Sequence, residues 1–277
     1  MTRSRDLCAV AAISLLLGAC SADHSADHSA DHSVGHGAEH ASAGAASHDM
    51  ATHEPAELDQ ELVARIIGDD VVYLTQLGLM RGHLFVGVRL YQEGEHSEAA
   101  THMKHPESEL YAELRPGLEQ RGAPDFASQL EALAVAVETH QTLAQVDRLY
   151  AELLTSIKQA EAATADIGGA QVAQVIKALL DNVAYEYDIA VGADGMLLNA
   201  HEYQDCLGFV EVANEYIDTL QQRSDEAASI QGLRQQMAFL QQVFPITVPS
   251  SRQPLTQPAL VNEVIDRIGV TLAGFPL

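Results

Sequence analysis

The sequence is poor in aromatic residues and in positive charge. It has no tryptophan, 5% aromatic residues, and 15 basic against 39 acidic side chains, for a net charge of −24. The scarcity of aromatic rings argues against a carbohydrate-binding cleft. The negative field repels nucleic acids and anionic lipids and attracts cations, so no nucleic-acid partner is expected. An ordinary soluble surface without a cation ligand would carry the same charge.

The sequence also lacks the alternating apolar pattern of β-strands. Apolar residues recur at helical spacing instead, as Leu74, Leu77, Leu84 and Val88 do. Helices are expected over residues 58–66, 71–91, 107–120, 170–191, 201–222, 225–244 and 258–272, with two more within 125–167. We therefore predict an all-α bundle of about seven to nine helices, with Gly168-Gly169 as a candidate boundary between two packed halves.

Common catalytic motifs are absent as well. The chain has no His-Glu-x-x-His zinc helix, no Gly-x-Ser-x-Gly elbow, no phosphate-binding loop and no haem-attachment motif. Its single Glu-x-x-His unit, Glu93 to His96, is interrupted by Gly94, whereas a carboxylate-bridged di-metal bundle needs two such units on continuous helices. The sequence thus favours a protein that is not an enzyme, with a helical metalloenzyme as an alternative.

The chain has three cysteines, and the second marks the end of an export signal. Arg3 and Arg5 precede a short apolar run, residues 9–17, which is too short to span a bilayer. The sequence Leu-Gly-Ala-Cys at residues 17–20 resembles the bacterial lipoprotein box, which implies cleavage before Cys20 and lipid on its thiol and new amino group. An ordinary secretory peptide is the alternative.

Such a lipoprotein would be anchored in the bacterial cell envelope. Ser21 after the lipidated cysteine favours the outer membrane over the inner membrane. Cys206 then remains as a lone thiol that cannot form an internal disulfide, and it is expected to be a small buried residue. We predict a signal peptide at residues 1–19, a lipidated tail at 20–55 and a helical domain at 56–277, with a division near residue 168.

The tail is rich in histidine. Seven of the thirteen histidines lie there, within Ser-Ala-Asp-His repeats at the start: His24, His28, His32, His36, His40, His48 and His53. Large apolar residues are nearly absent, so the tail is expected to be disordered. Imidazole binds zinc, copper and nickel, and aspartate adds oxygen ligands. We interpret the tail as a metal-binding segment, against the simpler reading of a spacer.

The first candidate site in the helical domain is His102 with His105, directly before Pro106. A His-x-x-His pair can chelate a metal ion, and His83 could join it from the preceding long helix. The alternative is local structure, in which Pro106 opens a helix and the acidic residues Glu107 and Glu109 suit its positive N-terminal end.

The second candidate site combines the end of one expected helix with the start of the next. Glu186 and Asp188 come from the first, and His201, Glu202 and Asp205 from the second. His201 and Asp205 are four residues apart and share a helix face. A histidine with several carboxylates suits zinc, iron or manganese. Alternatively, Asn199 and Glu202 form only a helix-capping pattern.

This second segment also carries a family resemblance. Glu186-Tyr187, Ala190-Val191, Gly195, Glu202-Tyr203 and Asp205 are similar to a helical segment, here residues 186–209, of extracytoplasmic domains attached to high-affinity, oxidase-linked bacterial iron permeases. The resemblance implies a helical domain in periplasmic metal handling.

Taken together, these patterns predict an envelope lipoprotein that binds a divalent transition metal. Zinc is expected first, and iron or copper next, for acquisition, buffering or delivery to a metal transporter or receptor. The alternative is a structural lipoprotein that binds another envelope protein.

Overall fold

The computed structural model describes residues 58–106, 110–164, 167–250 and 252–276, and residues 56–277 form one compact unit. The export signal and the histidine-rich tail lie outside the described residues. The described part is built of helices and contains no β-strand. Its one isolated antiparallel β-bridge joins Val191 and Leu197. The predicted all-α fold is therefore confirmed.

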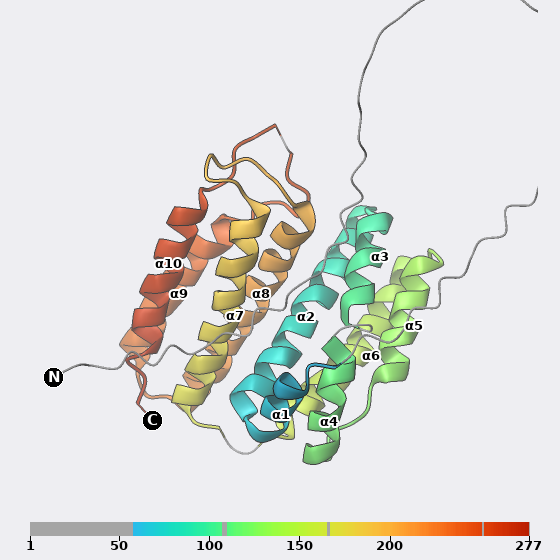
Figure 1. Ribbon diagram of the computed structural model, residues 1–277, viewed down its shortest axis with the longest axis horizontal. Helices are drawn as coiled ribbons and strands as arrows, with labels where there is room; N and C mark the ends of the chain where they lie inside the picture. The colour runs from blue at the N-terminus through green and yellow to red at the C-terminus, as the bar shows by residue number, and fades with distance from the viewer. Residues whose placement is uncertain (1–57, 107–109, 165–166, 251, 277) are drawn as a thin grey trace, which may run out of the picture. The chain divides into compact units, whose positions relative to one another are not determined.

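Ten helices make up the described chain (Figure 1). They are α1 (Gln60–Gly68), α2 (Asp70–Glu93), α3 (His96–His105), α4 (Tyr111–Arg121), α5 (Ala127–Glu138), α6 (Leu143–Ala162), α7 (Gly169–Ala190), α8 (Ala200–Arg223), α9 (Ala227–Gln242) and α10 (Pro258–Leu272).

The helices form two four-helix arrangements. In the C-terminal one, α7 packs on α8, α8 on α9, α9 on α10 and α10 back on α7. In the N-terminal one, α2 packs on α3, α3 on α5, α5 on α6 and α6 back on α2, and α1 and α4 cover one end of α2. Helix α2 also packs against α7 and α8, so it belongs to the core of both arrangements (Figure 1).

Helix α2 is the most deeply buried long element. Its apolar composition and length would allow it to cross a membrane, but 83% of its most apolar window is buried within the unit. It is therefore the central core helix. Asp69 caps its N-terminus by accepting hydrogen bonds from the backbone N–H groups of Val71 and Val72, and Gly94 ends it in the left-handed conformation.

The helices between α2 and α4 have other bounds than predicted. His102 and His105 do not precede a helix. They lie within α3, and Pro106 continues directly from the end of that helix in right-handed helical conformation. Helix α4 begins only at Tyr111, and residues 107–109 are outside the described part. The expectation failed because proline suits the first turn of a helix, yet it is equally compatible with the residue directly after one.

Two glycines set the distance between α2 and α8. A Cβ atom on Gly208 would lie 2.3 Å from the carbonyl oxygen of Gly82, and one on Gly82 would lie 2.5 Å from the ring of Phe209. Only residues without a side chain fit at this crossing. The backbones of α2 and α8 are consequently close enough for short polar side chains nearby to meet.

A buried ion pair ties the same two helices to α6. Arg81, 4% exposed, donates to Glu161 of α6 at 2.9 Å and also to Glu215 of α8. Tyr216 donates a further hydrogen bond to Glu161 at 2.9 Å. Arg81 therefore joins α2 to α6 through Glu161 and to α8 through Glu215. The second contact fixes the N-terminal helices against the C-terminal ones.

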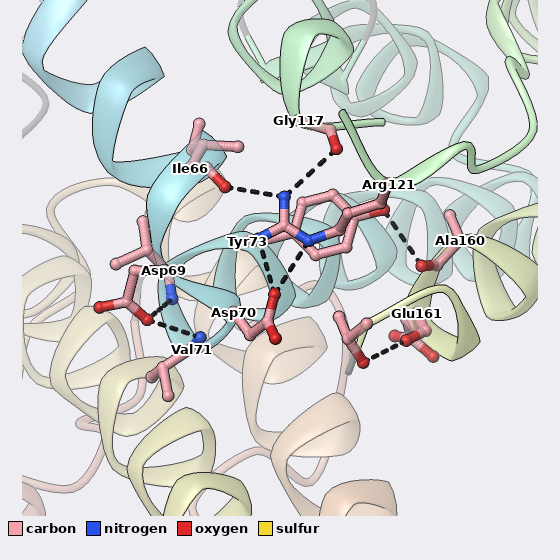
Figure 2. Close-up of polar contacts among 11 residues, drawn as sticks. Ile66, Asp69, Asp70, Val71, Tyr73, Gly117, Arg121, Ala160 and Glu161 are labelled. Carbon is pink, nitrogen blue, oxygen red and sulfur yellow. Dashed lines mark hydrogen bonds and ion pairs between the residues drawn. The ribbon is translucent and has the colours of Figure 1, made fainter. Parts of the chain in front are cut away.

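A second arginine fixes α1 and α4 at the end of α2, as Figure 2 shows. Arg121 of α4 donates to Asp70 at 2.7 Å and to the carbonyl oxygens of Ile66 and Gly117, while its guanidinium lies 4.1 Å from the centre of the Tyr73 ring. Tyr73 in turn donates to the carbonyl oxygen of Ala160. Arg121 thereby gives a partner to the Ile66 carbonyl group in the last turn of α1.

The α2–α8 crossing leads to a stability prediction. Gly208→Ala should lower the free energy of unfolding by about 3 kcal/mol, because the new methyl group meets backbone that can yield only if the helices move apart. Gly232→Ala in α9 is the matched control, since nothing lies within 4 Å of its Cβ position. It should raise stability by up to about 1 kcal/mol. Urea unfolding of both variants measures the difference, and equal effects would contradict the assigned packing.

Candidate metal centre

Three helices bring two histidines and one aspartate together beside the glycine crossing. His83 comes from α2, His102 from α3 and Asp205 from α8, and all three side chains are buried. One ligand atom of each lies within 4.8 Å of the others. His83 Nδ1 is 2.6 Å from Asp205 Oδ1, and His102 Nδ1 is 3.1 Å from the same oxygen. Within the described residues, this is the one cluster with such ligand spacing.

Gln204 determines which nitrogen of His102 faces Asp205. Its Oε1 lies 2.8 Å from His102 Nε2, and an amide oxygen can only accept a hydrogen bond. A neutral His102 would donate from Nε2 and turn the lone pair of Nδ1 toward Asp205, whereas a doubly protonated ring would donate to both residues. That Nδ1 is buried without a hydrogen-bond partner although a carboxylate oxygen is nearby. Either a proton or a metal ion between this nitrogen and the carboxylate oxygen would satisfy both atoms.

The spacing also suits a shared metal ion. Neighbouring ligand atoms that each lie about 2.1 Å from one metal ion are about 3.0 to 3.4 Å apart. The separation of 3.1 Å between His102 Nδ1 and Asp205 Oδ1 falls in this range, whereas the 2.6 Å between His83 Nδ1 and the same oxygen is a hydrogen-bond distance that would lengthen on metal binding. Two imidazoles and one carboxylate are a donor set that zinc and ferrous iron both accept, with further coordination positions left open.

His201 extends the cluster toward the surface. Its Nε2 lies 3.5 Å from Asp205 Oδ2, and its ring stacks on that of His102 at a centre distance of 4.1 Å. The His201 side chain is 23% exposed, whereas that of His102 is fully buried. The cluster therefore continues from the core to the first turn of α8.

Asp205 remains ionised despite its burial. Burial by itself would raise the pKa of Asp205, but the adjacent His83 and His102 outweigh this effect and hold that pKa below its usual range. An ionised carboxylate is the form that binds a metal ion.

Glu186 and Glu202 form a second carboxyl pair near Asp205. Burial, the hydrogen bond with Glu202 and the negative charges of Glu202 and Asp205 together raise the pKa of Glu186 to about 9. Glu202 is itself 8% exposed and accepts a hydrogen bond from Asn199. Glu186 is therefore protonated at neutral pH and shares its proton with a neighbouring carboxylate.

The structure unites parts of both sequence-based candidate sites. It brings His83 and His102 from the first together with His201 and Asp205 from the second, and places Glu186 and Glu202 nearby. The side chain of His105, the residues Glu107 and Glu109 and the seven tail histidines lie outside the described part.

Three further predictions about this region are resolved. Asp188 is exposed and accepts from Asn262 of α10, so it does not join the cluster. Asn199 does cap α8 by accepting from the backbone of His201. Capping therefore explains Asn199, but it does not explain why Glu202 is buried. Cys206 is buried with a free thiol, as expected.

Gln204 is the residue that sequence reasoning missed. It directly precedes Asp205, so its side chain would ordinarily be assigned to a different helix face. Gln204 and Asp205 of α8 both reach His102 of α3, and this is visible only once the helices are packed.

The fold and the cluster define an α-helical protein with a buried histidine–carboxylate centre. Residues 168–275 match the family model of the iron permease-associated 4-helix bundle domain. The match begins just before α7 and ends just after α10, and it confirms the resemblance predicted from residues 186–209. No curated protein and no solved structure matches the chain. His83 and His102 lie outside the matched segment.

The raised pKa of Glu186 leads to a prediction about stability and pH. The carboxyl group is protonated in the folded state up to about pH 9 and ionised in the unfolded state above about pH 4.5. Folding therefore takes up a proton, and stability falls as pH rises between these values. In metal-free buffer at pH 8, Glu186→Gln should raise the free energy of unfolding by about 1 to 3 kcal/mol.

The gain should vanish toward pH 4.5, where both states of the wild type are protonated. Glu131→Gln, at an exposed position of α5, is the control and should change little at any pH. Thermal unfolding across the pH range measures both variants. A destabilised Glu186→Gln protein at pH 8 would show that an ionised Glu186 is required.

Proposed function

We propose that this protein is an envelope lipoprotein that binds a divalent transition metal ion and serves metal transport. The observation that supports it best is the buried group of His83, His102 and Asp205 with its ligand atoms within 4.8 Å. Buried polar side chains are normally paired by hydrogen bonds, and a neutral His102 that donates to Gln204 would face Asp205 with no proton between the two atoms. A bound cation satisfies both groups.

The favoured ions are ferrous iron and zinc. The donor set of two imidazoles and one carboxylate is compatible with both. The match of residues 168–275 to a domain described as iron permease-associated favours iron as cargo and a metal transporter as partner. The zinc-first expectation rested on the histidine-rich tail, where imidazole is the dominant donor.

The tail and the lipid anchor would complete the function. Lipid on Cys20 would hold one end at the membrane, and the tail histidines would collect divalent ions with little selectivity. The net charge of −24 supports this role by attracting cations. The buried centre would then provide the selectivity, because its three ligands come from three helices fixed by packing.

Metal binding tests the proposal directly. The full chain, with Cys20→Ser and all seven tail histidines replaced by alanine, should be stabilised by ferrous iron or by zinc. A concentration one hundred times the dissociation constant should raise the free energy of unfolding by about 2.7 kcal/mol. Asp205→Asn should remove the tightest site, as measured by competition with a chromophoric chelator under anaerobic conditions.

Asp218→Asn is the matched control on the same helix. Asp218 pairs with Arg234 at the surface, and its side chain is 67% exposed. The control should bind metal as tightly as the parent protein. If the parent binds neither ion, or if Asp205→Asn binds as well as Asp218→Asn, the His83–His102–Asp205 cluster is a structural polar core and the proposed metal site is wrong.

The lipid anchor has a separate test. Cell fractionation should find the parent protein in the membrane fraction and the Cys20→Ser protein in the soluble fraction, because the thioether-linked lipid cannot form without the thiol. Cys8→Ser, within the expected signal peptide, should leave the protein at the membrane. A Cys20→Ser protein that stays with the membrane would rule out anchoring through this residue.

A further inference from the structure

Two other histidines meet at the opposite end of α3 from His102. His96 begins α3, and His140 lies in the turn between α5 and α6. Their rings are 4.9 Å apart, measured between centres, at an angle of 68°. The helical domain contains six histidines, and the five with described side chains all fall into this pair or into the buried centre.

The separation of these two rings suits a shared metal ion. Imidazoles that bind one ion through nitrogen atoms at about 2.0 Å have ring centres about 5 Å apart when the ligand angle is near tetrahedral. The observed 4.9 Å is close to that value. Two histidines that pack only as aromatic rings can have the same ring separation, whatever the positions of their nitrogen atoms. The environment of the nitrogen atoms therefore distinguishes a metal site from aromatic packing.

One of these nitrogens is unsatisfied. His96 Nδ1 is buried and has no hydrogen-bond partner. Both histidines also line a surface cavity of about 300 Å³, together with Tyr91, Gln92 and Gln141. A buried polar atom without a partner costs free energy, and a metal ion bound to His96 Nδ1 after a rotation of the ring toward the cavity would remove that cost.

The backbone holds His140 in an unusual conformation. Its φ of +52° lies in the left-handed region, where helix C-termini normally carry glycine or asparagine. The turn is fixed from both sides: His140 N–H donates to Val137, and Tyr91 donates through its hydroxyl to the carbonyl oxygen of Gln141. Histidine is among the residues that adopt this conformation more often than most, so the turn accommodates the imidazole and holds it in place without requiring it.

We propose that His96 and His140 form a second metal site, at the surface, for a borderline divalent ion such as zinc, copper or nickel. The two imidazoles supply two ligands, and water in the open cavity supplies the others. The site is separate from the buried centre. It lacks a carboxylate ligand among the residues that line its cavity, so it prefers nitrogen-seeking ions over ferrous iron.

The test is the number of zinc ions bound by the full chain. The background is again Cys20→Ser with the seven tail histidines replaced by alanine, titrated with zinc by calorimetry at pH 7.5. It should bind two zinc ions. His96→Phe keeps the ring that packs 4.5 Å from Tyr91, and His140→Asn keeps a residue that tolerates the left-handed conformation. Either variant should bind one zinc ion with unchanged thermal stability in metal-free buffer.

The buried centre provides the matched comparison. His83→Ala with His102→Ala should also bind one zinc ion, and that ion should be lost on adding His96→Phe. Unchanged zinc stoichiometry in both His96→Phe and His140→Asn overturns the surface site. If only the His83→Ala, His102→Ala protein loses a zinc ion, the surface site is also overturned, but the proposed function stands. One zinc ion lost only with His96→Phe or His140→Asn supports the surface site and overturns the buried one.

Discussion

The close approach of α2 and α8 is the constraint on which the rest of the structure depends. Gly82 and Gly208 leave no room for a Cβ atom between the two backbones. Because these helices nearly touch, His83 and Asp205, whose side chains are short, can come within 2.6 Å of each other. The same crossing lets Arg81 reach Glu215. The His83–Asp205 and Arg81–Glu215 contacts between α2 and α8 thus depend on the absence of side chains at the two glycines.

Buried charge is tolerated in this core only where partners from other helices compensate for it. Arg81 is paired with carboxylates of α6 and α8, and Asp205 is surrounded by imidazoles of α2 and α3. Glu186 has no cation of this kind, and its carboxyl group is protonated instead. These three outcomes are the ordinary alternatives for an ionisable group removed from water. The Asp205 cluster differs in that two imidazoles and a carboxylate from three helices lie within 4.8 Å, which is a donor set for a metal ion.

Much of the fold was predictable, because helical spacing of apolar residues is a local property. Leu74, Leu77, Leu84 and Val88 indicated α2, and Gly94 and Gly122 mark the ends of α2 and α4 as expected. The segment around Pro106 was predicted wrongly, since a proline that follows a helix and one that opens a helix look alike in sequence. The candidate ligands were named as two separate groups, and Gln204 was absent from both. Side chains more than 100 residues apart, such as His102 and Asp205, meet only through packing.

The sequence by itself determined the helical class, the location of the apolar faces, the acidic character of the chain and the histidine-rich tail, because each depends on composition or on spacing within a few residues. The tertiary structure alone decided which polar residues form one site. It placed His83, His102 and Asp205 around a common point, left Asp188 at the surface, and paired His96 with His140. The physical reason is that ligand geometry is set by distances between helices, and here those distances are set by glycine contacts and buried ion pairs that no local pattern encodes.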